Sequence, residues 1–292
     1  MPSIGSGDIA RAEWSNVWQF EHLLYLCNLV NDPFSVHVSQ YLTERRPFRH
    51  ALSLSFFGTL PSNSEKMNHE PNIRGTEGRS RRAVAVYTPL ALAFYDLAVL
   101  GFSNSFVWQC PSRVLLDFYN RHISARHLDI GVGTGYFLDR CRFPSNAPKI
   151  ALVDLNSNSL AKSAKRLRRY NPSCYKGDAL QPIDIGMSGF NSISLNYLLH
   201  CLPGDLASKS LVFENVKPLL RDGGIIFGST ILGEGVRHNP LARQLMKIYN
   251  AKGIFSNLSD RQSDLEAGLD AHFDEHTIHI AGCVALFSAR KR

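Results

Sequence analysis

The chain has 292 residues, a formal net charge of +7 and a pI near 9.1, and 44% of its residues are hydrophobic. This size and composition are typical of a globular protein with one large domain or two modest ones, and they exclude a need for disulfides or a metal to hold the core together. The six cysteines are far apart and include no Cys-x-x-Cys pair, so we predict free thiols in a reducing, cytoplasmic compartment and no zinc site.

The start of the chain is predicted to lie outside the organised domain. It lacks a basic n-region, and Glu21 and His22 interrupt the apolar run 17–30, so no secretory signal is expected. The polar stretch 60–82 is rich in Ser, Asn, Glu, Pro, Gly and Arg, which predicts a flexible linker. We therefore divide the chain into an N-terminal extension and linker of unknown function at 1–82 and a folded domain at 83–292.

Two helices are predicted before the first strand. Thr88-Pro89 supplies a hydroxyl N-cap and then a proline at the first helical position, which predicts a helix that ends near residue 100. A second helix is predicted to begin at Pro111. The apolar run 89–108 has the length of a membrane span, but Asp96 and Asn104 within it favour a buried helix followed by a loop, so no membrane partner is expected.

Strands and helices alternate from residue 126 onward. Strands are predicted at 126–130, 149–154, 173–178, 190–195 and 224–229, with helices at 134–143, 157–169 and 204–220. This alternation indicates a parallel sheet with helices on both faces. A helix at 260–269 and strands at 272–281 and 283–289 follow, and they predict a C-terminal antiparallel hairpin.

The positive charge is dispersed along the chain. The densest cluster, on the predicted helix 157–169, comprises Lys162, Lys165, Arg166, Arg168 and Arg169. A nucleic-acid-binding stripe would carry interleaved exposed aromatic side chains, and only Tyr170 lies nearby. We therefore interpret the cluster as the solvated face of a helix and predict no nucleic-acid partner.

A glycine-rich turn follows the first predicted strand. Gly131, Gly133 and Gly135 stand at every second position, and such a turn indicates a backbone that approaches a ligand, since a Cβ would block the approach. The dinucleotide fingerprint requires G-x-G-x-x-G, and Tyr136 stands where its third glycine would be. The turn is therefore typical of nucleoside-binding proteins that hold S-adenosylmethionine (SAM).

Polar residues end the first four predicted strands, and ligands of open parallel sheets lie beyond those ends. Asp154 is placed to accept hydrogen bonds from both ribose hydroxyls of a nucleoside. Asp178 is placed to accept from the adenine amine, and the Ala179 N–H to donate to a ring nitrogen. Asp129 and Asn196 are placed to meet an ammonium group. Any one aspartate could be a turn or N-cap residue, but the joint pattern, in step with the glycines, indicates a cofactor site.

The region from about residue 83 to 291 resembles the class I SAM-dependent methyltransferases. The family's first three motifs match Leu-Asp-Ile-Gly-Val-Gly-Thr-Gly at 128–135, Val-Asp-Leu-Asn at 153–156 and Gly-Asp-Ala at 177–179. The segments 196–202 and 217–224 match the regions after the fourth strand and before the fifth. Tyr87-Thr88-Pro89, Tyr95-Asp96 and the ending 282–287 resemble small-molecule methyltransferases of fungal secondary-metabolite pathways.

The resemblance implies an α/β fold of the Rossmann-like class I methyltransferase type, with a mostly parallel sheet and a C-terminal antiparallel hairpin. It also implies SAM as the cofactor and in-line transfer of its methyl group, with the reacting atoms held ~3–3.5 Å apart. The residues expected to bind the cofactor are Asp129, Gly131, Gly133, Gly135, Asp154, Leu155, Asp178, Ala179, Asn196 and Tyr87.

A general base would assist methyl transfer to a hydroxyl. His200, just past the fourth strand, is the first candidate catalytic residue, and the alternative is a helix-face histidine without catalytic duty. His238, in the loop 233–240, is the second candidate, and its alternative is a surface loop residue. The segment 241–258, with Tyr249 and Phe255, is expected to form part of a substrate lid or ordinary packing.

We predict a cytoplasmic enzyme that transfers the SAM methyl group to a small-molecule acceptor in secondary-metabolite biosynthesis. Two alternatives stay open: a SAM-binding enzyme of the same fold that catalyses a rearrangement or cyclisation, and a non-catalytic SAM-binding subunit. The segment 196–199, Asn-Tyr-Leu-Leu, lacks the Asn/Asp-Pro-Pro-Tyr/Phe pattern of enzymes that methylate nucleic-acid or glutamine nitrogens. There is no carboxylate set for a metal-dependent catechol reaction, so no metal is predicted. The acceptor, the methylated atom and the oligomeric state are left open.

Overall fold

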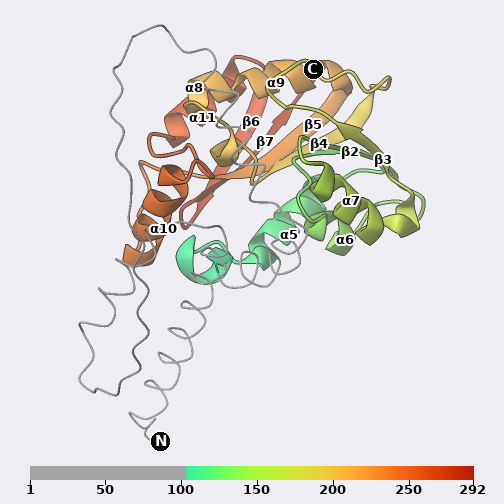
Figure 1. Ribbon diagram of the computed structural model, residues 1–292. Helices are drawn as coiled ribbons and strands as arrows, with labels where there is room; N and C mark the ends of the chain where they lie inside the picture. Colours follow the sequence, from blue (N-terminus) through green and yellow to red (C-terminus); the bar gives the residue numbers. More distant parts are fainter. Residues whose placement is uncertain (1–102) are drawn as a thin grey trace, which may run out of the picture. The chain divides into compact units, whose positions relative to one another are not determined.

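The computed structural model describes residues 103–292, which contain a seven-stranded sheet in the order β3-β2-β1-β4-β5-β7-β6 (Figure 1). Strands β1 to β5 pair in parallel, and β7 is antiparallel to both β5 and β6. This confirms the predicted fold class. The strands are β1 (Arg126–Ile130), β2 (Lys149–Asp154), β3 (Ser173–Lys176), β4 (Phe190–Asn196), β5 (Leu220–Ile231), β6 (Glu275–Ala281) and β7 (Val284–Arg290).

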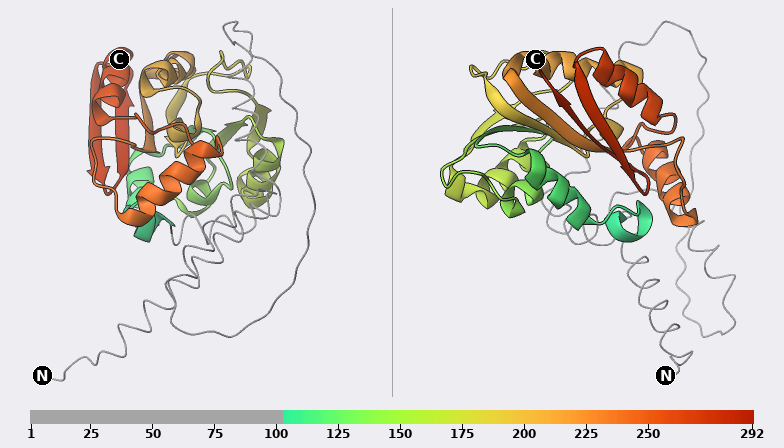
Figure 2. Two further views of the ribbon diagram at one scale, coloured as in Figure 1. Left: turned by 60° about the vertical axis from the view of Figure 1, so that its left-hand side comes forward. Right: turned by 180° about the vertical axis from the view of Figure 1, so that it is seen from behind.

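Helices cover both faces of the sheet, as both views in Figure 2 show. Buried side chains of α5, α6, α7 and α10 pack on one face, and those of α8, α9 and α11 on the other. The α-helices are α5 (Ser112–His122), α6 (Tyr136–Arg140), α7 (Ser157–Arg166), α8 (Leu206–Lys209), α9 (Leu211–Val216), α10 (Pro240–Ala251) and α11 (Gln262–Asp270). Single 3-10 turns are η2 (Arg168–Tyr170), η3 (Leu199–Cys201) and η4 (Lys217–Leu219).

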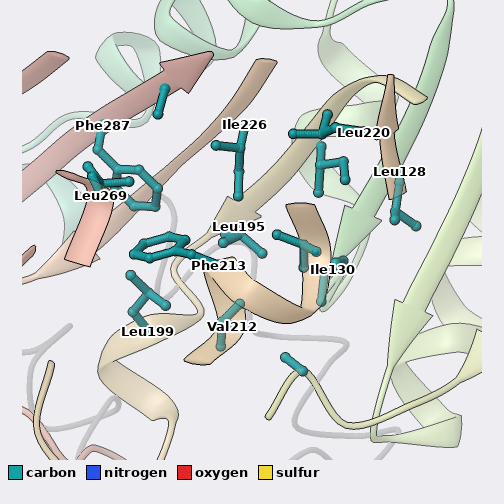
Figure 3. Packing of buried hydrophobic residues seen from close by; sticks show 14 of the residues in the cluster. Leu128, Ile130, Leu195, Leu199, Val212, Phe213, Leu220, Ile226, Leu269 and Phe287 are labelled. Atoms are coloured by element: carbon teal, nitrogen blue, oxygen red, sulfur yellow. The ribbon is translucent and has the colours of Figure 1, made fainter. Parts of the chain in front are cut away.

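Both faces of the central strands are buried, with an apolar cluster on one face and both apolar and polar side chains on the other. Side chains alternate between the faces along a strand, so Leu128 and Ile130 of β1 lie on the face of α9 and α11. Figure 3 shows this cluster, where Phe213 of α9 packs edge-on against Phe287 of β7 with ring centroids 5.9 Å apart. The buried clusters on the two faces hold the strands in place. They therefore also fix the edge of the sheet where the polar residues lie.

The predicted strands 126–130 and 149–154 coincide with β1 and β2, but two predicted helices differ. The helix predicted at 204–220 is divided into α8, α9 and η4. The hydroxyl of Ser210 donates to the carbonyl of Ala207 at 2.6 Å, and such back-bonding bends a helix. The helix predicted at 134–143 is the short α6, and Phe143 precedes a proline, which disfavours helical backbone.

The fifth strand is longer than the predicted 224–229. The backbone of Gly223 and Gly224 exchanges hydrogen bonds with Lys291, just past the end of β7, and this pairing accompanies the extension of β5 back to Leu220. β6 begins at Glu275 rather than 272, because the N–H groups of His272 and Phe273 bond to the carbonyl of Leu269 in α11. The predicted extension at 1–82, the predicted helix at 88–100 and Tyr87 lie outside the described residues.

Candidate functional site

A cavity lies at the carboxyl ends of the parallel strands. Its walls come from the turn after β1, the tip of β2, the segment after β3 and the segment from the end of β4 to Pro203. The structure thus brings together all the described residues of the predicted cofactor set: Asp129, Gly131, Gly133, Gly135, Asp154, Leu155, Asp178, Ala179 and Asn196.

The three glycines of the turn all have positive φ, which L side chains rarely adopt. A Cβ at Gly131 would lie 2.8 Å from Cδ1 of Leu198, and one at Gly135 would lie 3.0 Å from Cβ of Ser163. A Cβ at Gly133 would meet no atom within 4 Å. The first and third glycines are therefore closely packed within the protein, while Gly133 faces open space on a cavity wall.

Asp154 is fixed at the tip of β2 by two backbone donors. Its Oδ1 accepts from the N–H of Asn156 at 2.8 Å, and its Oδ2 accepts from the N–H of Gly133 at 3.3 Å. Burial raises the pKa of this carboxyl, while both N–H bonds lower it. A carboxylate has about four acceptor positions, so two remain for a ligand in the cavity.

Asp178 follows β3 and reaches the same cavity. Its Oδ1 accepts from the N–H of Leu180 at 3.0 Å, which is the local turn that the simpler interpretation of this aspartate predicts. The carbonyl of the next residue, Ala179, accepts from Nδ2 of Asn215 at 3.0 Å, which ties the segment to α9. The turn and the cavity wall are thus formed by one segment.

Asp129 lies within β1, is 6% exposed and lines the cavity. Its Oδ1 accepts from Oγ of Ser194 at 2.6 Å, and its Oδ2 from the hydroxyl of Tyr119 at 3.4 Å. Burial raises the pKa of the carboxyl to about 7, against the opposing effect of these two hydrogen bonds.

Asn196 ends β4 and presents a buried amide to the cavity. Its Oδ1 accepts from Oγ of Ser229 at 3.1 Å, but its Nδ2 is buried and has no hydrogen-bond partner in the described part of the chain. Buried polar groups are nearly always bonded, so an unsatisfied donor on a cavity wall indicates that a ligand atom completes it.

Sequence reasoning missed Tyr197, whose φ of +53° places it in the left-handed region although it is not glycine. Its hydroxyl donates to Oδ1 of Asn104 at 3.0 Å, and its N–H donates to the carbonyl of Ser229 at 2.8 Å. Strained backbone of this kind clusters at functional sites. The sequence carries no signal for it, since a tyrosine after a strand has no particular turn preference.

The structure does not bring His200 to the cavity wall. The ring is 3% exposed, its Nδ1 accepts from the N–H of Ile231 at 3.3 Å, and its centroid lies 4.5 Å from that of Phe255. Burial, with a smaller effect of Lys209, lowers the pKa of His200 to about 3, so the imidazole is neutral and weakly basic. This geometry favours the histidine without catalytic duty.

His238 also lies outside the residues that line the cavity, and its Nε2 donates to the carbonyl of Leu232 at 2.8 Å. The segment 241–258 contains α10 and an aromatic cluster. There, Phe255 contacts Tyr249 and Trp108, with centroids 4.9 and 6.0 Å apart. These contacts are those of packed side chains, which favours the ordinary-packing interpretation of this segment.

Two cations of the basic cluster hold neighbouring elements. Arg166 donates to Oγ1 of Thr134 at 3.1 Å, and Arg169 forms an ion pair with Asp139 of α6. Lys165 and Arg168 are exposed, as on a solvated helix face. Among residues 103–292, no helix has the length and apolar character of a membrane span, and no cluster of three or more His, Cys, Asp or Glu side chains forms a metal site.

Comparisons with known proteins agree with this geometry. Residues 128–226 match a family model described as a methyltransferase domain. The chain is 38% identical over 205 residues to demethylluteothin O-methyltransferase from Streptomyces thioluteus, covering 70% of this chain and 89% of that one. It is 44% identical over 211 residues to methyltransferase ctvB from Aspergillus terreus, covering 70% and 92%.

The fold is also similar to that of a solved structure, phosphoethanolamine N-methyltransferase 2 from Haemonchus contortus in complex with phosphomonomethylethanolamine and S-adenosylhomocysteine. The TM-score is 0.56 with 15% sequence identity, and the match covers 73% of this chain and 60% of that one. At this identity the similarity concerns the fold.

Proposed function

This chain belongs to the SAM-dependent methyltransferases, and we propose that it transfers the methyl group of SAM to a hydroxyl of a small secondary metabolite. The name of the relative from Streptomyces thioluteus supports an oxygen acceptor, as does that of a further relative, the physcion biosynthesis cluster O-methyltransferase from Aspergillus chevalieri, which is 36% identical over 223 residues. The words "biosynthesis cluster" in the second name support a secondary-metabolite pathway. We place the enzyme in the cytoplasm, which is supported by free thiols at Cys110, Cys141, Cys174 and Cys283.

The described cavity fits SAM on its own geometry. The observation that carries the proposal is the joint placement, on one cavity wall, of the open side of Gly133, the Asp154 carboxylate and the unsatisfied amide of Asn196. When bound, SAM supplies a methyl group on a positively charged sulfur. The carboxylates of Asp129, Asp154 and Asp178 around the same cavity give it a negative character that suits a cation.

The roles proposed for these residues follow from where each can reach. Asp154 has two free acceptor positions at the tip of β2 and holds the ribose hydroxyls. Asp178 and the Ala179 N–H bind the adenine edge. Asp129 and the second acceptor position of Asn196 Oδ1 meet the ammonium of the methionine end, above the glycine turn, and Nδ2 of Asn196 donates to an acceptor atom of the ligand.

The enzyme's own contribution to the reaction is alignment. Holding the acceptor oxygen in line with the methyl group replaces a bimolecular encounter by a positioned one. A neutral, buried His200 serves to fix η3 against the end of β5 through its bond to Ile231, so its proposed role is to support the segment after β4 and not to move a proton.

The cofactor assignment is tested by thermal unfolding with and without S-adenosylhomocysteine. At a hundredfold excess over the dissociation constant, linkage stabilises the native protein by about 2.7 kcal/mol and raises Tm. Asp154→Ala removes the ribose acceptor and is expected to abolish most of this shift. The matched control is Asp184→Ala, an exposed aspartate outside the cavity wall that accepts a hydrogen bond from the N–H of Gly186. An unchanged shift in Asp154→Ala would show that the ribose assignment is wrong.

Methyl transfer itself is tested by mass spectrometry after incubation with methyl-labelled SAM and a small-molecule extract of the host. Transfer gives a product heavier by one labelled methyl group together with S-adenosylhomocysteine. A rearrangement or cyclisation would leave SAM intact, and a non-catalytic subunit would give no turnover by the isolated chain. Either result contradicts the proposal.

A further inference from the structure

Behind the cavity, a chain of buried hydrogen bonds leads from Asp129 into the sheet. The hydroxyls of Tyr119 and Ser194 bond the two carboxylate oxygens of Asp129. Nε2 of His127 lies 3.1 Å from the Tyr119 hydroxyl and 3.0 Å from Oγ of Ser194. Nδ1 of His127 lies 2.8 Å from Oγ of Ser192. Tyr119, His127, Ser192 and Ser194 are fully buried, and they come from α5, β1 and β4.

With Asp129 ionised, the hydroxyls of Tyr119 and Ser194 can each direct their one proton to the carboxylate. The Tyr119 hydroxyl also lies 3.1 Å from Oγ of Ser194 and 3.1 Å from Nε2 of His127. When Nε2 carries the imidazole proton, it donates to these two oxygens, and Ser192 donates to Nδ1. In this arrangement every proton points toward Asp129, which makes its carboxylate a preformed acceptor for a positive charge.

Protonation of Asp129 reverses this order. A neutral carboxyl has an O–H that must itself find an acceptor, and two of its neighbours already point their protons at it. The neutral form also has no charge to offer an ammonium. The ionised form of Asp129 can therefore pair with an ammonium, and the neutral form cannot.

We propose that Tyr119, His127 and Ser194 are positioning residues that hold the Asp129 carboxylate ready for the ammonium of the cofactor, so that cofactor binding releases a proton from Asp129. This rests on the proposed function, because it takes the ammonium to lie beside Asp129. The proton balance is simple: the O–H bond of neutral Asp129 breaks, the proton passes to solvent, and the ionised carboxylate pairs with the cation.

Three of the groups that face Asp129 from neighbouring elements do not change their charge near neutral pH. Burial raises the pKa of Tyr119 well above its usual range and that of Cys141 to about 12, and it lowers the pKa of His127 to about 3. These three stay uncharged. Asp154, across the turn, carries the same sign of charge as Asp129 and raises its pKa further, and burial raises the pKa of Asp154 as well. The experiment must therefore separate the two carboxyls.

The sign of the pH dependence follows from the raised pKa of Asp129, about 7 in the free protein. Above that pH the carboxylate is ready, and affinity no longer depends on the protonation of Asp129. Below it, each bound ligand must displace a proton, so affinity falls by about tenfold per pH unit. At pH 7, binding is expected to release about half a proton per ligand.

The test is the dissociation constant of S-adenosylhomocysteine, measured by calorimetry from pH 5.5 to 8.5. Two buffers with different ionisation enthalpies give the number of protons released by the wild-type protein. The comparison ligand is 5′-methylthioadenosine, which has the adenosine but no ammonium, and its affinity reports any titration of Asp154. We expect the plot of log Kd against pH to change slope near pH 7 for S-adenosylhomocysteine but not for 5′-methylthioadenosine. This change of slope is called the break.

Removing a donor to the ionised carboxylate raises its pKa, so the break moves to higher pH, by roughly one unit, in Tyr119→Phe and in Ser194→Ala. Tyr119→Phe keeps the ring that packs against Phe227. Asp129→Asn loses the break. The matched control is Tyr175→Phe, a tyrosine of β3 outside the cavity wall whose hydroxyl contacts only Sδ of Met187 among the described bonds. It leaves the break in place.

If Tyr119 and Ser194 served in packing alone, their replacement would weaken binding equally at all pH values and leave the break at the same pH. That outcome overturns the inference while the proposed function stands, as does wild-type binding without proton release. Should the wild-type protein fail to bind S-adenosylhomocysteine at any pH, the inference and the proposed function fail together. The proton count on the wild-type chain remains decisive even when a variant does not fold.

Discussion

Gly133 and Gly186 have the same backbone conformation but different surroundings. Their φ angles are +55° and +65°, and a Cβ on either would meet no atom within 4 Å. Gly133 lines the cavity, whereas Gly186 lies on an exposed turn outside it. The pair therefore separates the cost of backbone strain from the cost of blocking a ligand.

We expect Gly133→Ala and Gly186→Ala to lower stability by a similar amount, roughly 1–2 kcal/mol for left-handed backbone in an L residue. Only Gly133→Ala should weaken binding of S-adenosylhomocysteine, by at least about tenfold, or ~1.4 kcal/mol, because its methyl group enters the cavity. Calorimetric titration and urea unfolding of both variants measure the two effects. Equal affinity in the two variants would contradict the placement of the cofactor beside Gly133.

At this scale the sequence predicts the cavity wall well, for a physical reason. The carboxyl ends of parallel strands meet at one edge, so residues such as Asp129 and Asp154, distant in sequence, are brought together by the alternation of strands alone. The sequence could not predict the left-handed Tyr197 or the unsatisfied amide of Asn196, because both depend on tertiary contacts with Ser229. It also could not show that His200 is withdrawn from the cavity.

Among the elements, α8 is tied to the segment between α10 and α11 by a buried ion pair. Nζ of Lys209 donates to Oδ2 of Asp260 at 2.6 Å, and neither side chain is exposed. The carbonyl of Asp260 accepts from the N–H groups of Gly233 and Glu234, just after β5. One pair thus fixes three elements behind the site, and burial shifts the pKa of each partner toward its neutral form.

Lys209→Met is expected to lower the free energy of unfolding by about 3–5 kcal/mol, because it leaves Asp260 buried without a counter-charge. The matched control is Glu234→Gln, which breaks the exposed pair between Glu234 and Arg261 and should cost less than about 1 kcal/mol. Urea unfolding followed by tryptophan fluorescence measures both. Similar losses in the two variants would show that burial does not set the strength of the Lys209 pair.

Element boundaries were predictable where local signals suffice. β2 is a short apolar run bounded by polar residues, and β1 alternates polar and apolar side chains before the glycine turn; both ends of each strand agree with the prediction. The early start of β5 was not predictable, because it accompanies pairing with Lys291, far along the chain. The division between α8 and α9 coincides with the local hydrogen bond of the Ser210 hydroxyl, which has no marker in a hydrophobic pattern.

For the whole molecule, both faces of one sheet carry large buried clusters within residues 107–289. A single sheet covered on both faces is a complete core by itself. We expect a chain of residues 83–292, without the predicted extension, to unfold cooperatively and to keep its affinity for S-adenosylhomocysteine within about threefold. A threefold change in affinity corresponds to ~0.6 kcal/mol of binding free energy. Loss of cooperative unfolding in that chain would contradict the proposed domain boundary.

The place of β7 has a consequence for how the protein is made. This strand follows β6 in sequence, yet it lies between β5 and β6 and contributes the buried Phe287 to the core. Until residues 284–290 have been synthesised and have left the ribosome, β6 has no neighbour to pair with and β5 has an open edge. The sheet therefore closes only after β6 is complete, and a chain truncated before residue 284 would expose two unprotected, aggregation-prone strand edges.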